Sequence, residues 1–120
     1  MKRTILAPGH ELLSYRIHEV TPYINWIYFF HAWGFQPRFA AIANIHGCDS
    51  CRALWLTTFP EEERTKASEA MQLFKEANRM LDRLDETISI HCIFRLCQAN
   101  ADGDNLLIEG TPFPLLRQQT

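Results

Sequence analysis

The sequence predicts an α+β domain in which helices cover one face of an antiparallel sheet. Apolar residues recur every three or four positions over residues 61–85, which is typical of a helix, and at every second position from residue 88, which is typical of a strand. The pair Asp102-Gly103 is a common hairpin turn and so indicates antiparallel strands. Because 120 residues can bury a hydrophobic core of their own, we expect residues 1–120 to form a single domain.

The first predicted helix spans residues 22–33. Thr21 is a favourable N-cap, Pro22 suits the first helical position, and Gly34 can end the helix. Since this helix is apolar nearly all round, we expect it to be sandwiched between other elements. Ahead of it, residues 14–20 alternate like a strand or lead into the helix.

The aromatic side chains of this helix have two interpretations. Such residues usually form a core, in which the polar tips of Trp and Tyr find hydrogen-bond partners. They can also form the wall of a pocket, where Asn25 would offer its carbonyl to a cationic group and the rings would shield that group from water.

The second predicted helix, over residues 61–85, begins at a capping box formed by Thr58 and Glu61. Between residues 35 and 60, Pro and Gly interrupt the pattern, and we expect one short helix there.

A strand is predicted from residue 88 to residue 97, and residues 106–109 are expected to run back beside it. Pro112 and Pro114 are expected to stop or displace any further strand, because proline cannot donate a ladder hydrogen bond.

The composition is that of an ordinary globular protein. With 47% hydrophobic residues and a formal net charge of −2, we expect neither a disordered chain nor a nucleic-acid-binding protein. The sequence has no apolar run of the length of a signal peptide or a membrane span, so we expect a cytoplasmic protein with reduced thiols. Cys92 and Cys97 lie on opposite faces of one predicted strand and cannot bond to each other.

Cys48 and Cys51, with His46 nearby, have the spacing of a metal knuckle or a redox pair. A tetrahedral zinc site needs four ligands, so the fold would have to add Cys92 or His91. We favour two ordinary thiols and no metal. The sequence contains no self-contained catalytic set, so residues alone do not assign an enzyme activity.

Four segments together resemble the opening part of the activation domain of cobalamin-dependent methionine synthase. The first is Tyr-Ile-Asn-Trp, followed by Phe-Phe and Trp; the others are EAMQLFKEANRMLDRL, ANADGDNL and LRQQ, at residues 23–33, 69–84, 99–106 and 116–119. The family patterns are Tyr-Ile-Asp-Trp for the first and AN-x-x-GDDI for the third, where Asn105-Leu106 replaces the last two residues. The resemblance covers roughly residues 15 to 120 and is weakest over residues 39–68.

The resemblance implies a role in reactivating methionine synthase. In that family the activation domain binds S-adenosylmethionine, and reduction of cob(II)alamin by a flavodoxin-like donor is followed by methylation. We therefore expect the partners to be the cobalamin-binding methionine synthase domains, with cobalamin held by a partner chain or domain. The alternative is a non-catalytic binding module that docks a corrinoid protein or self-associates as a homodimer.

Two departures from the family pattern concern the site. Asn25 replaces the aspartate that accepts from the amino group of S-adenosylmethionine, so a charge-assisted hydrogen bond becomes an ordinary one, a loss of about 1 kcal/mol or more. The family's Arg-Pro-x-x-Gly-Tyr-Pro segment, which follows LRQQ and supplies most contacts to the methyl donor, is not in these 120 residues. We expect a divergent or truncated relative that needs a second chain to complete the site.

Overall fold

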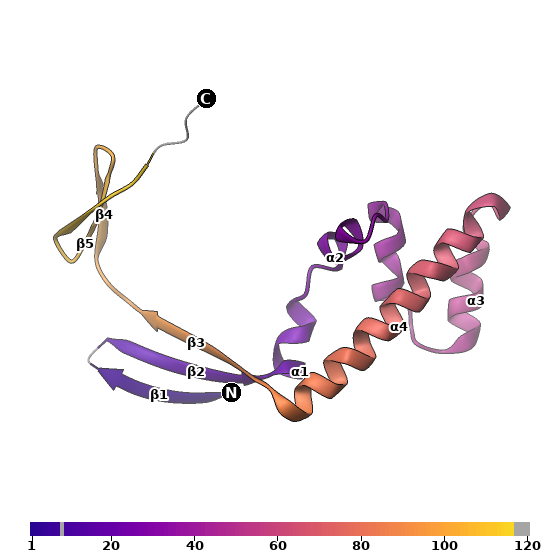
Figure 1. Cartoon of the computed structure of the whole chain (residues 1–120), viewed down its shortest axis with the longest axis horizontal. Coiled ribbons are helices and arrows are strands. Elements are labelled where there is room, and N and C mark those ends of the chain that lie inside the picture. Colours follow the sequence, from indigo (N-terminus) through magenta and orange to yellow (C-terminus); the bar gives the residue numbers. More distant parts are fainter. Residues whose placement is uncertain (8, 117–120) are drawn as a thin grey trace. The chain divides into compact units, whose positions relative to one another are not determined.

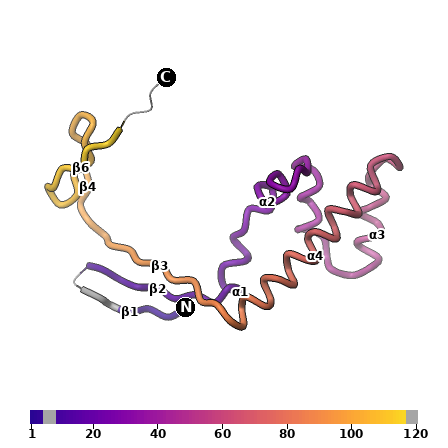
Figure 2. The backbone as a smooth tube through the Cα atoms, viewed as in Figure 1, coloured from indigo at the N-terminus to yellow at the C-terminus, as the bar shows by residue number. Residues whose placement is uncertain are grey.

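A computed structural model describes residues 1–7 and 9–116 of the chain (Figures 1 and 2). Helices and antiparallel strands are both present, which confirms the predicted α+β class. Of the LRQQ segment, residues 117–119 lie outside the described residues. The chain divides into two compact units: Met1–Tyr15 with Ile90–Thr120, and Arg16–Ser89.

The first unit begins with a three-stranded sheet, in the order β1-β2-β3. Strand β1 (Lys2–Ala7) pairs antiparallel with β2 (His10–Arg16), and β3 (Ser89–Arg95) lies on the other side of β2. The Ser14 hydroxyl and His91 Nδ1 are 2.9 Å apart. The strand predicted over residues 88–97 is therefore real but shorter, and residues 106–109 do not run beside it.

The second sheet of this unit is an antiparallel meander in the order β4-β5-β6, which follows the first sheet along the chain (Figure 1). Its strands are β4 (Ala99–Asp102), β5 (Asn105–Ile108) and β6 (Thr111–Pro114). The prediction of one sheet around residues 88–109 is therefore wrong, since the strand residues belong to two separate three-stranded sheets.

The two turns of this meander explain the remaining differences from the prediction. The first turn centres on Gly103-Asp104, one residue later than expected, and Gly103 has a φ of 59°. The second turn is Glu109-Gly110, where both residues have positive φ, as a type I′ turn requires. Pro112 and Pro114 lie in β6, at the edge of the sheet, where an outward-facing position needs no N–H donor. The prediction that they stop a further strand is wrong.

The second unit is helical. It contains α-helices, labelled α, and 3-10 helices, labelled η. In chain order they are α1 (Ile17–Val20), η1 (Thr21–Tyr23), α2 (Trp26–Ala32), η2 (Pro37–Asn44), α3 (Asp49–Thr57), η3 (Glu61–Glu63) and α4 (Arg64–Thr87). The long helix predicted over residues 61–85 is confirmed as η3 and α4. Residues 35–60 contain both η2 and α3, where a single short helix was expected.

The first helix begins later than predicted. Thr21 starts the short η1 turn, Ile24 is extended, and Asn25 is the N-cap of α2. Pro22 therefore belongs to η1, because the extended backbone at Ile24 separates the two helical segments. The prediction of one helix over residues 22–33 is wrong at its start.

Gly34 ends α2 as predicted. Its φ of 81° suits glycine, and its N–H donates to His31 O while the Phe35 N–H donates to Phe30 O, both at 2.9 Å. These two bonds form a Schellman motif, and the rings of Phe30 and Phe35 make the apolar contact that accompanies it, with centroids 5.7 Å apart.

The Thr58–Glu61 capping box is not formed. Thr58 is the C-cap of α3, and its hydroxyl donates to Trp55 O at 2.6 Å. The main helix starts later, at Arg64, after the η3 turn. Thr58 therefore ends one helix, because the chain before it is already helical.

The buried core of the described residues lies in the helical unit. Its members come from α2, η2, α3 and α4 and the connections between them: Phe30, Phe35, Phe39, Ala40, Ile42, Trp55, Phe59, Ala67 and Ala70. A chain of ring contacts runs through it; the rings of Trp55 and Phe59, for example, have centroids 4.9 Å apart in an edge-to-face arrangement. Ala67 and Ala70 are fully buried, so their small side chains let the other elements approach α4 closely.

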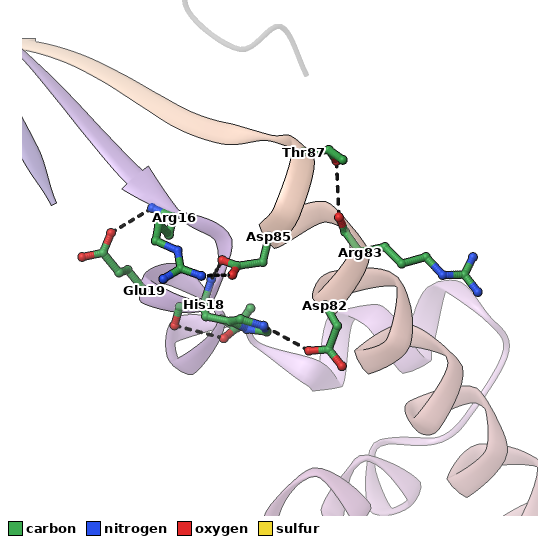
Figure 3. Close-up of polar contacts among 8 residues, drawn as sticks. Arg16, His18, Glu19, Asp82, Arg83, Asp85 and Thr87 are labelled. Carbon is green, nitrogen blue, oxygen red and sulfur yellow. Dashed lines mark hydrogen bonds and ion pairs between the residues drawn. The ribbon is translucent and has the colours of Figure 1, made fainter.

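Polar contacts join α1 to the end of α4 (Figure 3). The Asp85 carboxylate accepts from Arg16 Nη2 and, at 3.1 Å, from the His18 N–H, and its side chain is only 6% exposed. His18 Nε2 also lies 3.0 Å from Asp82 Oδ1. These contacts hold the segment that leads into η1, and with it the position of Asn25 just beyond.

Candidate functional site

Asn25 lies at the start of α2 with its side chain exposed to solvent. Its Oδ1 accepts a hydrogen bond from the Ile27 N–H at 3.2 Å, which makes it the helix N-cap. An amide oxygen has a second lone pair, and Nδ2 is a donor. Asn25 therefore serves the fold and can still present polar groups to a ligand.

A surface pocket of about 540 Å³ adjoins Asn25. One wall is formed by residues 22–27 and the other by η2, through Pro37, three alanines and Asn44. None of the described residues that line it carries a charge, and the polar side chains among them are those of Tyr23, Asn25 and Asn44. The pocket can therefore hold a ligand of mixed polarity.

The aromatic residues of this predicted helix divide between two environments. Phe30 is fully buried, whereas Tyr23 is 84% exposed and Trp33 is 62% exposed. The expectation that the helix is sandwiched on all sides is wrong for this chain, because α2 is a short helix whose buried residue is Phe30. Tyr23 lines the Asn25 pocket, and Trp33 lines a second hollow.

An apolar groove of about 340 Å³ lies between α2 and α4. Trp33 and Phe29 contribute from one side and Met80 and Leu84 from the other. Ile24 and Trp26 line both this groove and the Asn25 pocket, so the two hollows share a wall. The groove offers an apolar contact surface next to the pocket.

A second polar cluster lies at the start of α3. Candidate ligand atoms of His46, Cys48 and Cys51 are all within 4.8 Å of one another. The Cys48 pKa is lowered to about 6, chiefly because the Cys51 side chain hydrogen-bonds to its sulfur, and Ser50 and His46 add to the effect. The same hydrogen bond raises the pKa of Cys51. Cys48 is therefore the thiol of this pair that ionises first.

The structure adds residues that the sequence did not single out. Asn44 and the alanines of η2 line the Asn25 pocket, but nothing in the irregular pattern of residues 35–60 placed η2 opposite Asn25. Pro37 was a usable signal, because proline favours the first turn of a helix.

None of the helices in the described part of the chain has the length and apolar character needed to span a membrane. A family model described as vitamin B12 dependent methionine synthase, activation domain, matches residues 16–120. No curated protein and no solved structure matches the chain.

Proposed function

Because the chain belongs to the family of vitamin B12-dependent methionine synthase activation domains, we propose that it binds S-adenosylmethionine at the Asn25 pocket and supports reductive methylation of cob(II)alamin. Cobalamin would be held by the cobalamin-binding methionine synthase domains, on a partner chain or as another domain, with a flavodoxin-like protein as electron donor. S-adenosylmethionine supplies the methyl group and cobalamin the cobalt that receives it, so the protein's part is to bind and orient the methyl donor.

The observation that carries this proposal is the position of Asn25 on an open pocket. Its volume of about 540 Å³ lies within the range of small-molecule sites, about 300–1,000 Å³. The second lone pair of Asn25 Oδ1 can accept from the ammonium group of the ligand while the first keeps the Ile27 N–H. Tyr23 and Trp26 line the same pocket, and such rings attract a sulfonium cation.

The pocket fits only part of this ligand. Among the described residues that line it, none is cationic, so the ligand's carboxylate would face water or a group from a partner chain or domain. We therefore propose that affinity for S-adenosylmethionine rises when the cobalamin-binding partner is present.

The test is titration calorimetry with S-adenosylmethionine, on the chain alone and with the partner. Asn25→Asp keeps an N-cap of equal quality and restores a carboxylate, so it should tighten binding about fivefold, as expected for about 1 kcal/mol from a charge-assisted hydrogen bond. Asn25→Ser also keeps the cap but shortens the side chain, so it should weaken binding while the free energy of unfolding stays nearly constant.

The expected pattern is opposite effects from the two variants with equal stability. No heat from millimolar ligand, either alone or with the partner, would contradict the proposal. Equal affinity in Asn25→Asp, Asn25→Ser and the unchanged chain would remove Asn25 from the site.

A second candidate function is a non-catalytic module that docks a corrinoid protein or a second copy of the chain. The apolar groove between α2 and α4 favours it, because Trp33 and Met80 line that groove and are 62% and 61% exposed. Tryptophan is enriched among the residues that contribute most to binding at protein interfaces. Loss of partner binding when Trp33 is replaced is the test of this function.

A further inference from the structure

The loop before α3 brings three metal-binding side chains together. Cys48 is the N-cap of α3, with extended backbone, and Cys51 follows in the first turn of the helix. The first helical turn places the backbone of Cys51 close to the side chain of Cys48, and the Cys51 N–H donates to Cys48 Sγ at 3.3 Å. His46 lies beside them, and its Nδ1 accepts from the Cys48 N–H, with 3.4 Å between the two nitrogens.

We propose that His46, Cys48 and Cys51 bind one thiophilic d¹⁰ metal ion of the Zn²⁺ class, with a fourth coordination position left open. Two sulfurs and one imidazole nitrogen are a donor set that Zn²⁺ prefers over the oxygen-seeking ions Mg²⁺ and Ca²⁺. The site shares no lining residue with the Asn25 pocket, so the proposal does not depend on the binding of S-adenosylmethionine.

The distances suit this assignment. In a tetrahedral site with Zn–S bonds of about 2.3 Å and Zn–N bonds of about 2.0 Å, neighbouring ligand atoms are about 3.5 to 3.8 Å apart. The three candidate ligand atoms already lie within 4.8 Å of one another. Small side-chain rotations are therefore enough to bring the three ligand atoms to these separations, and α3 need not move.

Hydrogen bonds around Cys48 support the bound form. Its sulfur contacts the Cys51 N–H and, at 3.3 Å, the Ser50 hydroxyl. Donors of this kind orient a metal-bound thiolate and stabilise its charge. They come from the first turn of α3, so the helix itself positions the ligand.

The open position follows from the number and exposure of the ligands. Both cysteines are half-buried and His46 is exposed, so solvent reaches the centre of the cluster. Three protein ligands with water in the fourth place are the arrangement of zinc sites that keep an open coordination position, whereas structural zinc sites have four protein ligands.

The test uses the full chain, reduced and freed of metal. Zn²⁺ is titrated in competition with a chromophoric chelator, and Co²⁺ is added separately to record its ligand-field spectrum. We expect one equivalent of Zn²⁺ to bind and Co²⁺ to give a tetrahedral spectrum with sulfur-to-metal charge transfer.

The variants separate these ligands from the other thiols of the chain. Cys48→Ser keeps an N-cap oxygen, so α3 should still form, and the variant should lose stoichiometric binding, as should Cys51→Ser. His46→Gln should weaken binding at least tenfold. Cys92→Ser and Cys97→Ser are the matched controls, because both thiols are exposed and belong to the other unit, and they should change nothing.

Three results would overturn the proposal. The first is the absence of stoichiometric Zn²⁺ binding by the reduced chain, and the second is undiminished binding in Cys48→Ser. The third is an equal loss in Cys92→Ser, which would mean that Zn²⁺ binds to thiols without a built site. Circular dichroism of each variant shows whether a loss of binding reflects a loss of helix instead.

Discussion

At the scale of single residues, both candidate sites use a side chain that also caps a helix. Asn25 Oδ1 accepts from the Ile27 N–H at the start of α2, and Cys48 Sγ accepts from the Cys51 N–H at the start of α3. An N-cap is worth about 1 kcal/mol, so replacing either residue with alanine would mix a loss of stability with a loss of binding. Serine keeps the cap at both positions, which makes it the more informative substitution.

Alkylation of Cys48 in metal-free protein should become half-maximal near pH 6, because the thiolate is the nucleophile and its pKa is lowered to about 6. Cys51→Ala removes the largest cause of that shift and should move the midpoint to higher pH. Peptide mapping after a brief iodoacetamide pulse measures modification of Cys48 alone. The same midpoint in both proteins would contradict this account.

At the scale of elements, a charged side chain joins two helices that are distant in sequence. Asp85, near the end of α4, accepts from the His18 N–H and from Arg16, at the start of α1 (Figure 3). The His18 backbone hydrogen bond is the main cause that lowers the pKa of Asp85, and Arg16 adds to it. The α1 segment is therefore anchored by a carboxylate that must stay ionised.

Replacement of Asp85 by Asn should lower the free energy of unfolding at pH 7. It should also make the decrease of that free energy at acidic pH smaller than in the unchanged chain. The folded-state pKa is below the unfolded value, so the ionised group stabilises the fold above about pH 4, and this contribution is lost as the pH falls through the lower folded pKa. Urea midpoints measured from pH 7 down to pH 3 check this. Glu86→Gln, an exposed change on the same turn of α4, should leave the profile unaltered.

At the scale of the whole molecule, the two units differ in how much they bury. The core of the described residues comes from the helical unit, whereas strands β4 and β6 are exposed along their length. Core packing in the helical unit therefore fixes the positions of the elements that line its surface pocket and groove. The groove between α2 and α4, lined mainly by apolar side chains, suits an apolar partner.

Trp33→Gln should weaken docking of a cobalamin-binding partner, or self-association, by about 2 kcal/mol, roughly thirtyfold, as for a central interface tryptophan. Tyr28→Gln is the matched control, because Tyr28 is exposed on the same helix but does not line the groove. Light scattering of the chain and titration with the partner measure the two cases. Equal behaviour of both variants would exclude the groove as the docking surface.

The sequence by itself determined the α+β class, the long helix, the strand after it and the family, because these depend on local periodicity and on runs of side chains at fixed offsets. Through the family resemblance, it also offered Asn25 as a candidate site residue, at the one replaced position of the Tyr-Ile-Asn-Trp pattern. It did not predict the break at Ile24 or the edge strand at Pro112, where a turn and a sheet edge outweigh the local pattern.

Only the tertiary structure decided what faces Asn25. The η2 segment forms the far wall of the pocket. This placement depends on the packing of Phe39 and Ile42 into the core, which fixes η2. Contacts of this kind join elements that are distant in sequence, and the local pattern of one element does not specify which other element packs against it. Periodicity therefore could not have predicted them.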